Sequence, residues 1–270
     1  DATREKLEAE AAAARAEGVN TFLERMLEAA DPFQTELSGA DTTLIQMLDQ
    51  AEVWLDESFS DQPEIEAAAR LTLGRTYKGI GRFEPAERHL RRSVELARQC
   101  YASPHESIGT AMNELAVVLA PREGYDEAIE IGEASIEEFR GARPDDPGLA
   151  AIIGHVGWIH REAGDSEKSE RMTREAIPLA KGHHDVSVEA TLRNNLAGLV
   201  LARGDYDEAE RLYREVVALF EAHYDEGSPY VVLTRNNLGK LFMDRENFAE
   251  AEKWFQAARD GLELRIGLDQ

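Results

Sequence analysis

The chain has 270 residues, with 53 acidic and 30 basic side chains and a formal net charge of -23. This charge disfavours bulk binding to nucleic acid or to an anionic membrane surface, and a hydrophobic content of 43% indicates a folded protein. A single cysteine, Cys100, excludes an internal disulfide framework. No apolar run is long enough to span a bilayer, and no cleavable signal sequence is visible.

Residues 1–61 differ from the rest and are expected to form a stalk helix and a capping helical hairpin. Residues 4–31 are rich in Ala and Glu, a pattern typical of one long helix that ends before Pro32. An apolar stripe begins at Val19 and marks where this helix can pack. A second helix is expected after Asp41. The hairpin would cover the apolar end of the helices that follow. Because the chain begins at Asp1 inside a charged helix, we interpret it as a fragment of a longer protein.

From residue 62 to residue 270 one pattern recurs about five times. A small residue marks each unit, and the spacings between successive markers are about 40 to 42 residues, which is typical of a solenoid of helix pairs. The markers are Gly74, Ala116, Gly157, Ala197 and Gly239, in units of about 63–103, 104–144, 145–183, 184–226 and 227–266. The first helices are expected at 64–80, 105–120, 146–163, 186–203 and 228–245.

Each second helix is expected to approach its partner closely, because small residues recur on both helices. An aromatic residue at its start is expected to fill the wedge between them. These residues are Phe83, Tyr125, Tyr206 and Phe248, with Ser166 in the third unit. Tyr77, Leu119, Val200 and Phe242 are expected in the core. The last residues, LELRIGLDQ (262–270), resemble a loop that would open another repeat.

These landmarks resemble the tetratricopeptide repeat. The long unit, with NNLA at 194–197 and NNLG at 236–239, looks like the kinesin-light-chain type. The resemblance implies an all-α, right-handed superhelical solenoid of antiparallel helix pairs, with the first helix of each pair lining a concave groove. The N-terminal run VNTFLERMLEAADP is similar to the region after the transmembrane helix in planctomycete-type bacterial serine/threonine protein kinases. That similarity implies an extracytoplasmic signalling region, although no kinase motif is present.

If the resemblance holds, groove-lining residues fall at i, i+4 and i+7 of each first helix. The five first helices together carry a net charge of about +1, so the groove is relatively basic for this acidic chain and is expected to attract an acidic, extended peptide. Asparagine amides there can bond to a peptide backbone whatever its side chains. The residues expected to bind are Arg75, Lys78, Asn113, Trp158, Arg161, Asn194, Asn236 and Lys240.

Each of these residue types has a structural alternative. The asparagines can instead bond to a neighbouring helix and fix the angle between repeats. The basic residues can pair with acidic residues of adjacent helices, which contributes little at a surface. Trp158 can be a packed core residue or an exposed anchor for a partner.

Catalytic signals are weak, and we expect no enzyme, no cofactor and no metal. Cys100 has no base at useful spacing, so an inert thiol is expected. The neighbouring His183 and His184 do not share a helical face, and no second cluster completes a metal site. There is no Gly-rich phosphate loop and no GxSxG or HExxH motif.

The sequence therefore predicts a protein- or peptide-binding scaffold, interpreted as the sensor region of a membrane-tethered bacterial kinase. The alternative is a cytoplasmic adaptor similar to kinesin light chain, and the cellular location stays open between the two. No contact with nucleic acid or membrane is expected within this fragment. A homo-oligomer formed through the open C-terminal end is a further expectation.

Overall fold

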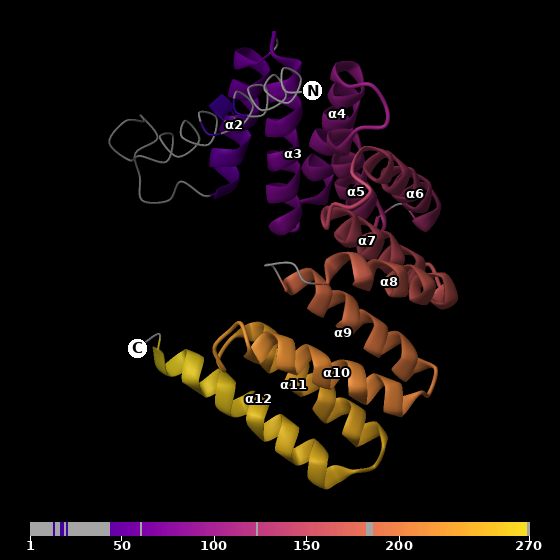
Figure 1. The fold of residues 1–270 in the computed structure, drawn as a ribbon. Coiled ribbons are helices and arrows are strands. Elements are labelled where there is room, and N and C mark those ends of the chain that lie inside the picture. Colours follow the sequence, from indigo (N-terminus) through magenta and orange to yellow (C-terminus); the bar gives the residue numbers. More distant parts are fainter. Residues whose placement is uncertain are drawn as a thin grey trace. The chain divides into compact units, whose positions relative to one another are not determined.

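The computed structural model describes Ala13, Glu17, Gly18, Asn20 and residues 44–59, 61–122, 124–181 and 186–268. All regular elements in these ranges are helices, so the predicted all-α class is confirmed (Figure 1). The helices are α2 (Leu44–Ser58), α3 (Pro63–Gly79), α4 (Phe83–Cys100), α5 (Glu106–Leu119), α6 (Tyr125–Ala142), α7 (Gly148–Glu162), α8 (Ser166–Ala180), α9 (Ser187–Ala202), α10 (Tyr206–Glu221), α11 (Pro229–Asp244) and α12 (Phe248–Leu268).

The chain forms two compact units, Asp1–Ala142 and Arg143–Gln270. The first contains α2 to α6 and the second contains α7 to α12. The division after Ala142 was not indicated by the sequence, and the expected boundary at residue 61 stays a prediction. Most of the expected stalk lies outside the described residues. Among the described helices, none combines the length and the apolar composition that a bilayer span requires.

Within each unit, consecutive helices pack as antiparallel pairs. In the first unit α3 packs on α4 and α5 on α6, and α4 also contacts α5. In the second unit the pairs are α7 with α8, α9 with α10 and α11 with α12, joined through α8 with α9 and α10 with α11. The first helices also touch one another, α3 with α5 and α7 with α9. This places α3 beside α5 in the first unit and α7 beside α9 in the second.

The turn inside each pair depends on a residue in the left-handed region. In the fourth repeat Gly204 has a φ of 90°. Its N–H donates to Leu201 O at 2.8 Å, and Asp205 N–H donates to Val200 O at 2.9 Å. These bonds satisfy the last carbonyls of α9. The Asp205 side chain then accepts from Glu208 N–H at 3.2 Å and begins α10.

The small marker residues let the paired helices approach closely, as predicted. A Cβ placed on Gly74 would lie 2.5 Å from Leu90 Cγ, and one on Gly239 would lie 2.6 Å from Phe255 Cδ1. Both distances are too short for real atoms, so each site requires glycine in this packing. Glycine at these positions therefore sets the separation of α3 from α4 and of α11 from α12.

The predicted wedge aromatics are wrong at two positions. Phe83 is 37% exposed and Phe248 is 61% exposed. Both are the first residue of their helix, α4 and α12. Tyr125 and Tyr206 also begin their helices, but they are partly buried, so the prediction fails only at Phe83 and Phe248.

The predicted core residues are confirmed, since Tyr77, Leu119, Val200 and Phe242 are all at most 4% exposed. The Tyr77 hydroxyl also donates to Asp49 Oδ1 of α2 at 3.0 Å, which ties α2 to the first repeat.

At the other end of the chain, the expected loop after residue 262 is wrong. Helix α12 continues through Leu268.

Candidate functional site

Helix α11 exposes one face, and this face carries both apolar and charged side chains. Leu233 and Lys240 lie seven residues apart and are both exposed, Leu233 by 57%. Asn237 lies between them on the same helical face. The opposite side of α11 is buried through Leu238 and Phe242. We use "first-helix face" for the exposed sides of α7, α9 and α11.

Asn237 links this face to the preceding repeat. Its Nδ2 donates to Asn194 Oδ1 of α9 at 2.9 Å. Asn194 was predicted to contact a peptide, but its carbonyl oxygen is used here by a neighbouring helix, which fits the alternative that asparagine fixes the repeat angle. Asn236, the residue chosen from the sequence, lies partly buried beside Asn237. Asn236 and Asn237 are both partly buried, and both lie within one turn of the exposed Lys240.

In the third repeat, Trp158 and Arg161 of α7 lie at the surface. Trp158 is partly exposed, so it is neither a fully buried core residue nor a fully exposed anchor. The Arg161 side chain is 36% exposed and its Nη2 lies 2.8 Å from Glu162 Oε1. This pairing with the adjacent residue leaves a local charge that is close to neutral.

In the first unit, Arg75 and Lys78 of α3 are already paired with Glu114 of α5. Arg75 Nε lies 2.8 Å from Glu114 Oε1, and Lys78 Nζ lies 2.5 Å from Glu114 Oε2. Burial by itself would raise the pKa of Glu114, but attraction to Arg75 and the bond from Lys78 outweigh it, and the pKa is lowered from its usual 4.5. The carboxylate of Glu114 occupies the position that an acidic ligand was expected to take.

Asn113 does not reach the surface. It is 4% exposed within α5, so its amide is not available to an incoming peptide. Most of α5 is buried against α3, α4 and α6, so little of this helix is left to line a groove. Glu114, the next residue, is the one that bonds across to α3. A charged residue beside an asparagine in the same helical turn was the signal that could have identified it.

Of the four basic residues predicted to bind, Lys240 differs from the other three. Arg75, Lys78 and Arg161 each have a carboxylate partner. Lys240 is exposed and makes no ion pair with another described residue. Its amino group is therefore the available cation on the first-helix face.

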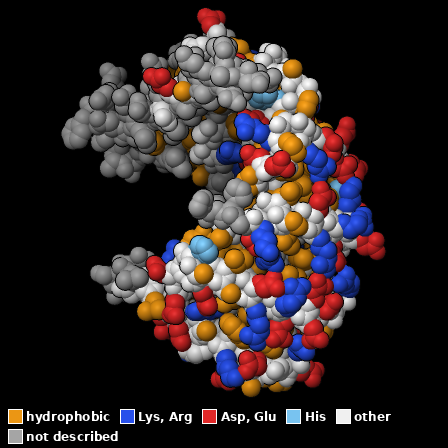
Figure 2. Space-filling view, in the orientation of Figure 1, with side chains coloured by type: hydrophobic (Ala, Val, Ile, Leu, Met, Phe, Trp, Pro, Cys, Tyr) orange, Lys and Arg blue, Asp and Glu red, His pale blue; other side chains and the backbone are white. Residues whose placement is uncertain are grey.

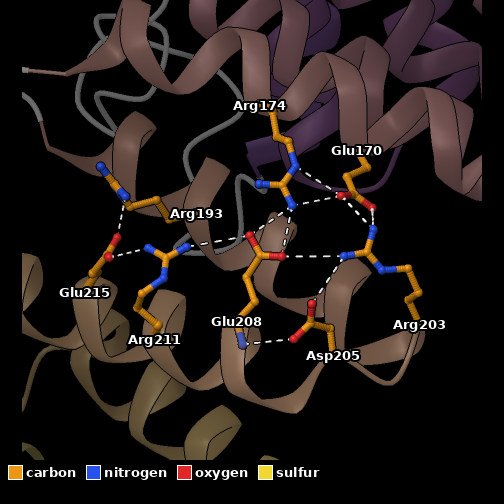
Figure 3. Close-up of polar contacts among 8 residues, drawn as sticks. All are labelled: Glu170, Arg174, Arg193, Arg203, Asp205, Glu208, Arg211 and Glu215. Atoms are coloured by element: carbon orange, nitrogen blue, oxygen red, sulfur yellow. Dashed lines mark hydrogen bonds and ion pairs between the residues drawn. The ribbon is translucent and has the colours of Figure 1, made fainter.

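The second helices carry a different kind of surface. The Glu208 carboxylate of α10 lies 2.9 Å from Arg174 Nη2 of α8 and 3.5 Å from Arg203 Nη2. Arg203 Nη1 also lies 3.0 Å from Glu170 Oε2. Figure 3 shows this network, in which carboxylates and guanidinium groups alternate from α8 to α10. Figure 2 shows acidic and basic side chains intermingled over these helices. Because its charges satisfy one another, this surface offers few free groups to a partner.

Catalytic chemistry gains no support from the described residues. Burial, and then the negative charges of Glu64 and Glu66, raise the pKa of the Cys100 thiol, which favours the unreactive protonated form. No group of three or more His, Cys, Asp or Glu side chains suited to a metal occurs in the described ranges. The histidine pair at 183 and 184 lies outside them.

Two models of the tetratricopeptide repeat match the sequence. One matches residues 107–182 and 188–263, and the other matches residues 67–105. The first alone covers more than half of the chain. The chain belongs to the tetratricopeptide repeat family. A search of curated protein sequences found no match.

Solved structures show the same tetratricopeptide fold. BtubC from P. vanneervenii is 19% identical, with 84% of this chain and 94% of that chain covered and a TM-score of 0.72. A Podosopora anserina protein described as a kinesin light chain with nearly identical TPR-like repeats is 19% identical, covers 72% and 94%, and has a TM-score of 0.61. PilF of Pseudomonas aeruginosa is 17% identical, covers 72% and 76%, and has a TM-score of 0.54. At these identities the likeness concerns the fold alone.

Proposed function

We propose that this tetratricopeptide repeat protein is a non-catalytic scaffold that binds an extended segment of a partner protein on the first-helix face of α7, α9 and α11. One observation carries the proposal. Helix α11 holds exposed Leu233 and Lys240 on one side, while Asn237 from the same side joins it to α9. The surface thus combines an apolar contact, a cation and amides on a rigid support.

Each group has a role in the proposed complex. Leu233, at 57% exposure, gives apolar area that a partner side chain would cover. Lys240 attracts a carboxylate, so the expectation of an acidic partner now depends on this residue. Asn236 and Trp158 extend the surface with an amide and a partly exposed ring. Such surfaces bind most strongly where a few apolar and aromatic residues are desolvated.

Selection from a displayed random-peptide library on the intact chain tests the proposal. We expect enrichment of peptides with an apolar residue near an acidic one, and loss of capture in Leu233→Asp and Lys240→Glu variants. Lys253→Glu is the matched control, because Lys253 is an exposed lysine on α12. Capture that survives both α11 changes, or that Lys253→Glu abolishes equally, would refute binding at this face.

For the cellular role we propose a sensor region of a membrane-tethered bacterial kinase, which rests on the resemblance of the N-terminal run. The alternative, an adaptor of the kinesin-light-chain type, is supported by fold likeness only. Fractionation of cells expressing the full-length gene product, with a kinase assay on the membrane fraction, distinguishes them. A soluble product without kinase activity would favour the adaptor.

We also keep self-association through the C-terminal end as a proposal. Helix α12 leaves Leu262 46% exposed and Leu264 53% exposed. A second copy could cover these side chains and remove them from water. Sedimentation of the chain and of a Leu262→Glu, Leu264→Glu variant tests this. A monomer at every concentration would rule it out.

A further inference from the structure

The first unit contains a cavity of about 510 Å³ between the N-terminal halves of α3 and α5. Its floor is apolar, and most of the side chains there are small. The floor residues include Ala67, Ala68, Leu71, Ala97 and Phe139. The alanines leave room that larger residues would fill, so the cavity is a consequence of the sequence at these positions. Its size falls in the range of sites that hold a small ligand or a side chain.

Two carboxylates lie at this cavity, Glu64 of α3 and Glu106 of α5. Glu64 makes no ion pair with another described residue. This distinguishes it from Glu66 and Glu114 of the same two helices, which pair with Arg70 and with Arg75 and Lys78. No lysine or arginine lines the cavity among the described residues. The lining of the cavity is therefore negatively charged, and no described lysine or arginine pairs with Glu64.

The helix dipole explains where these acids stand, but it does not explain why they stand beside an apolar cavity. Glu64 and Glu106 lie in the first turns of their helices, where a negative charge is favoured by the helix dipole. That preference would be met equally well over a filled, solvent-exposed surface. The combination of an apolar floor with carboxylates beside it matches a ligand with an aliphatic stem and a cationic end.

We propose that this cavity binds a lysine or arginine side chain of a partner segment. The methylene groups contact the alanines and Leu71, and the cation lies between Glu64 and Glu106. Tyr101 also lines the cavity, and its ring is stacked on that of His105 with the centroids 3.9 Å apart. The inference rests on the proposed function, because it assumes that the chain binds a partner protein and names a basic side chain of that partner. The cavity lies in the first unit, so it shares no residue with the first-helix face of the second.

Titration of the intact chain with three blocked amino acids, followed by amide chemical shifts in NMR spectra, tests the proposal. The probes are N-acetyl-lysine methylamide, N-acetyl-norleucine methylamide, which has the same carbon chain without the amine, and N-acetyl-glutamate methylamide. We expect the lysine probe to shift the amides of Ala67 and Thr110, with about ten-fold weaker binding of norleucine and none of glutamate. Equal binding of lysine and norleucine, or no shift with lysine, would overturn the proposal.

Variants locate the site. The double variant Glu64→Gln, Glu106→Gln should weaken lysine binding about ten-fold, and Ala68→Leu should abolish it by filling the cavity. Glu84→Gln is the matched control, because the Glu84 side chain is 84% exposed and does not line the cavity. Undiminished binding in Ala68→Leu would place the probe elsewhere and reject the site. If the double variant fails to fold, the norleucine comparison on the unaltered chain still decides.

This titration separates the two proposals. A chain that captures no peptide through Leu233 and Lys240 but binds the lysine probe at Ala67 would lack the proposed function and keep the cavity. A chain that captures peptides through α11 but shows no shift at Ala67 would keep the function and lose the basic anchor.

Discussion

Glu246 occupies the left-handed backbone position in the last repeat that Gly204 occupies one repeat earlier. Both residues stand two positions before the second helix of their pair, with φ of 58° at Glu246 and 90° at Gly204. Both turns make the same two backbone bonds. In the last repeat, Glu246 N–H donates to Met243 O and Asn247 N–H to Phe242 O, each at 2.9 Å. A residue with a Cβ is strained there, whereas glycine is not.

Adding a Cβ at position 204 and removing one at position 246 should therefore change the free energy of unfolding in opposite directions. We expect Gly204→Ala to lower the free energy of unfolding by about 1–2 kcal/mol. Glu246→Gly should raise it by about 0.5–1 kcal/mol, since relief of strain exceeds the added freedom of the unfolded chain. Urea denaturation followed by circular dichroism measures both changes. Shifts of equal sign would contradict the shared geometry.

The two glycines Gly74 and Gly157 mark the same repeat position but differ in the space around them. A Cβ on Gly74 would lie 2.5 Å from Leu90 Cγ, while one on Gly157 has its nearest neighbour at 3.5 Å. We expect Gly74→Ala to destabilise by about 1–3 kcal/mol through overpacking. Gly157→Ala should be neutral or stabilise by up to about 1 kcal/mol through helix propensity. Thermal unfolding of both variants compares them, and equal losses would show that packing is not the cause.

Glu114 should make stability depend on acidity. Its pKa is lower in the folded chain than its usual 4.5, so the unfolded chain takes up a proton first as the pH falls. The stabilisation is present above about pH 4.5 and is lost as the pH falls through the folded pKa. We expect Glu114→Gln to flatten this dependence and to lower stability at neutral pH by about 1 kcal/mol.

Urea midpoints measured from pH 7 down to pH 3 check the Glu114 prediction. Glu167→Gln serves as the control, because the Glu167 side chain is 93% exposed and is 3.9 Å from Arg171. An unchanged pH profile in Glu114→Gln would mean that the bonds to Arg75 and Lys78 contribute no coupling.

The network of Figure 3 should contribute little per pair despite its many contacts. Arg174 and Glu208 have side chains 41% and 21% exposed and lie 2.9 Å apart. Such pairs are screened by water and salt, so a double-mutant cycle with both changed to alanine should give a coupling below about 1 kcal/mol. Raising the salt concentration should reduce it further. A larger coupling that salt does not change would show that the network acts as one rigid unit.

Local sequence determined the helices and their turns. Glycine or a polar residue before each second helix, and small residues at intervals near 42, specify where helices end and how closely they pair. These are properties of neighbouring residues in the chain, so pattern alone indicates them. For the same reason the core positions of Tyr77 and Phe242 followed from periodicity.

Only the tertiary structure decided which side chains remain available for binding. Asn113 and Glu114 are consecutive, yet the first is buried and the second bonds to Arg75 and Lys78 across two helices. Likewise Asn194 is occupied by Asn237 from a helix more than 40 positions along the chain. Partners that come from distant residues determine whether a charge is free or satisfied, and folding alone brings them together.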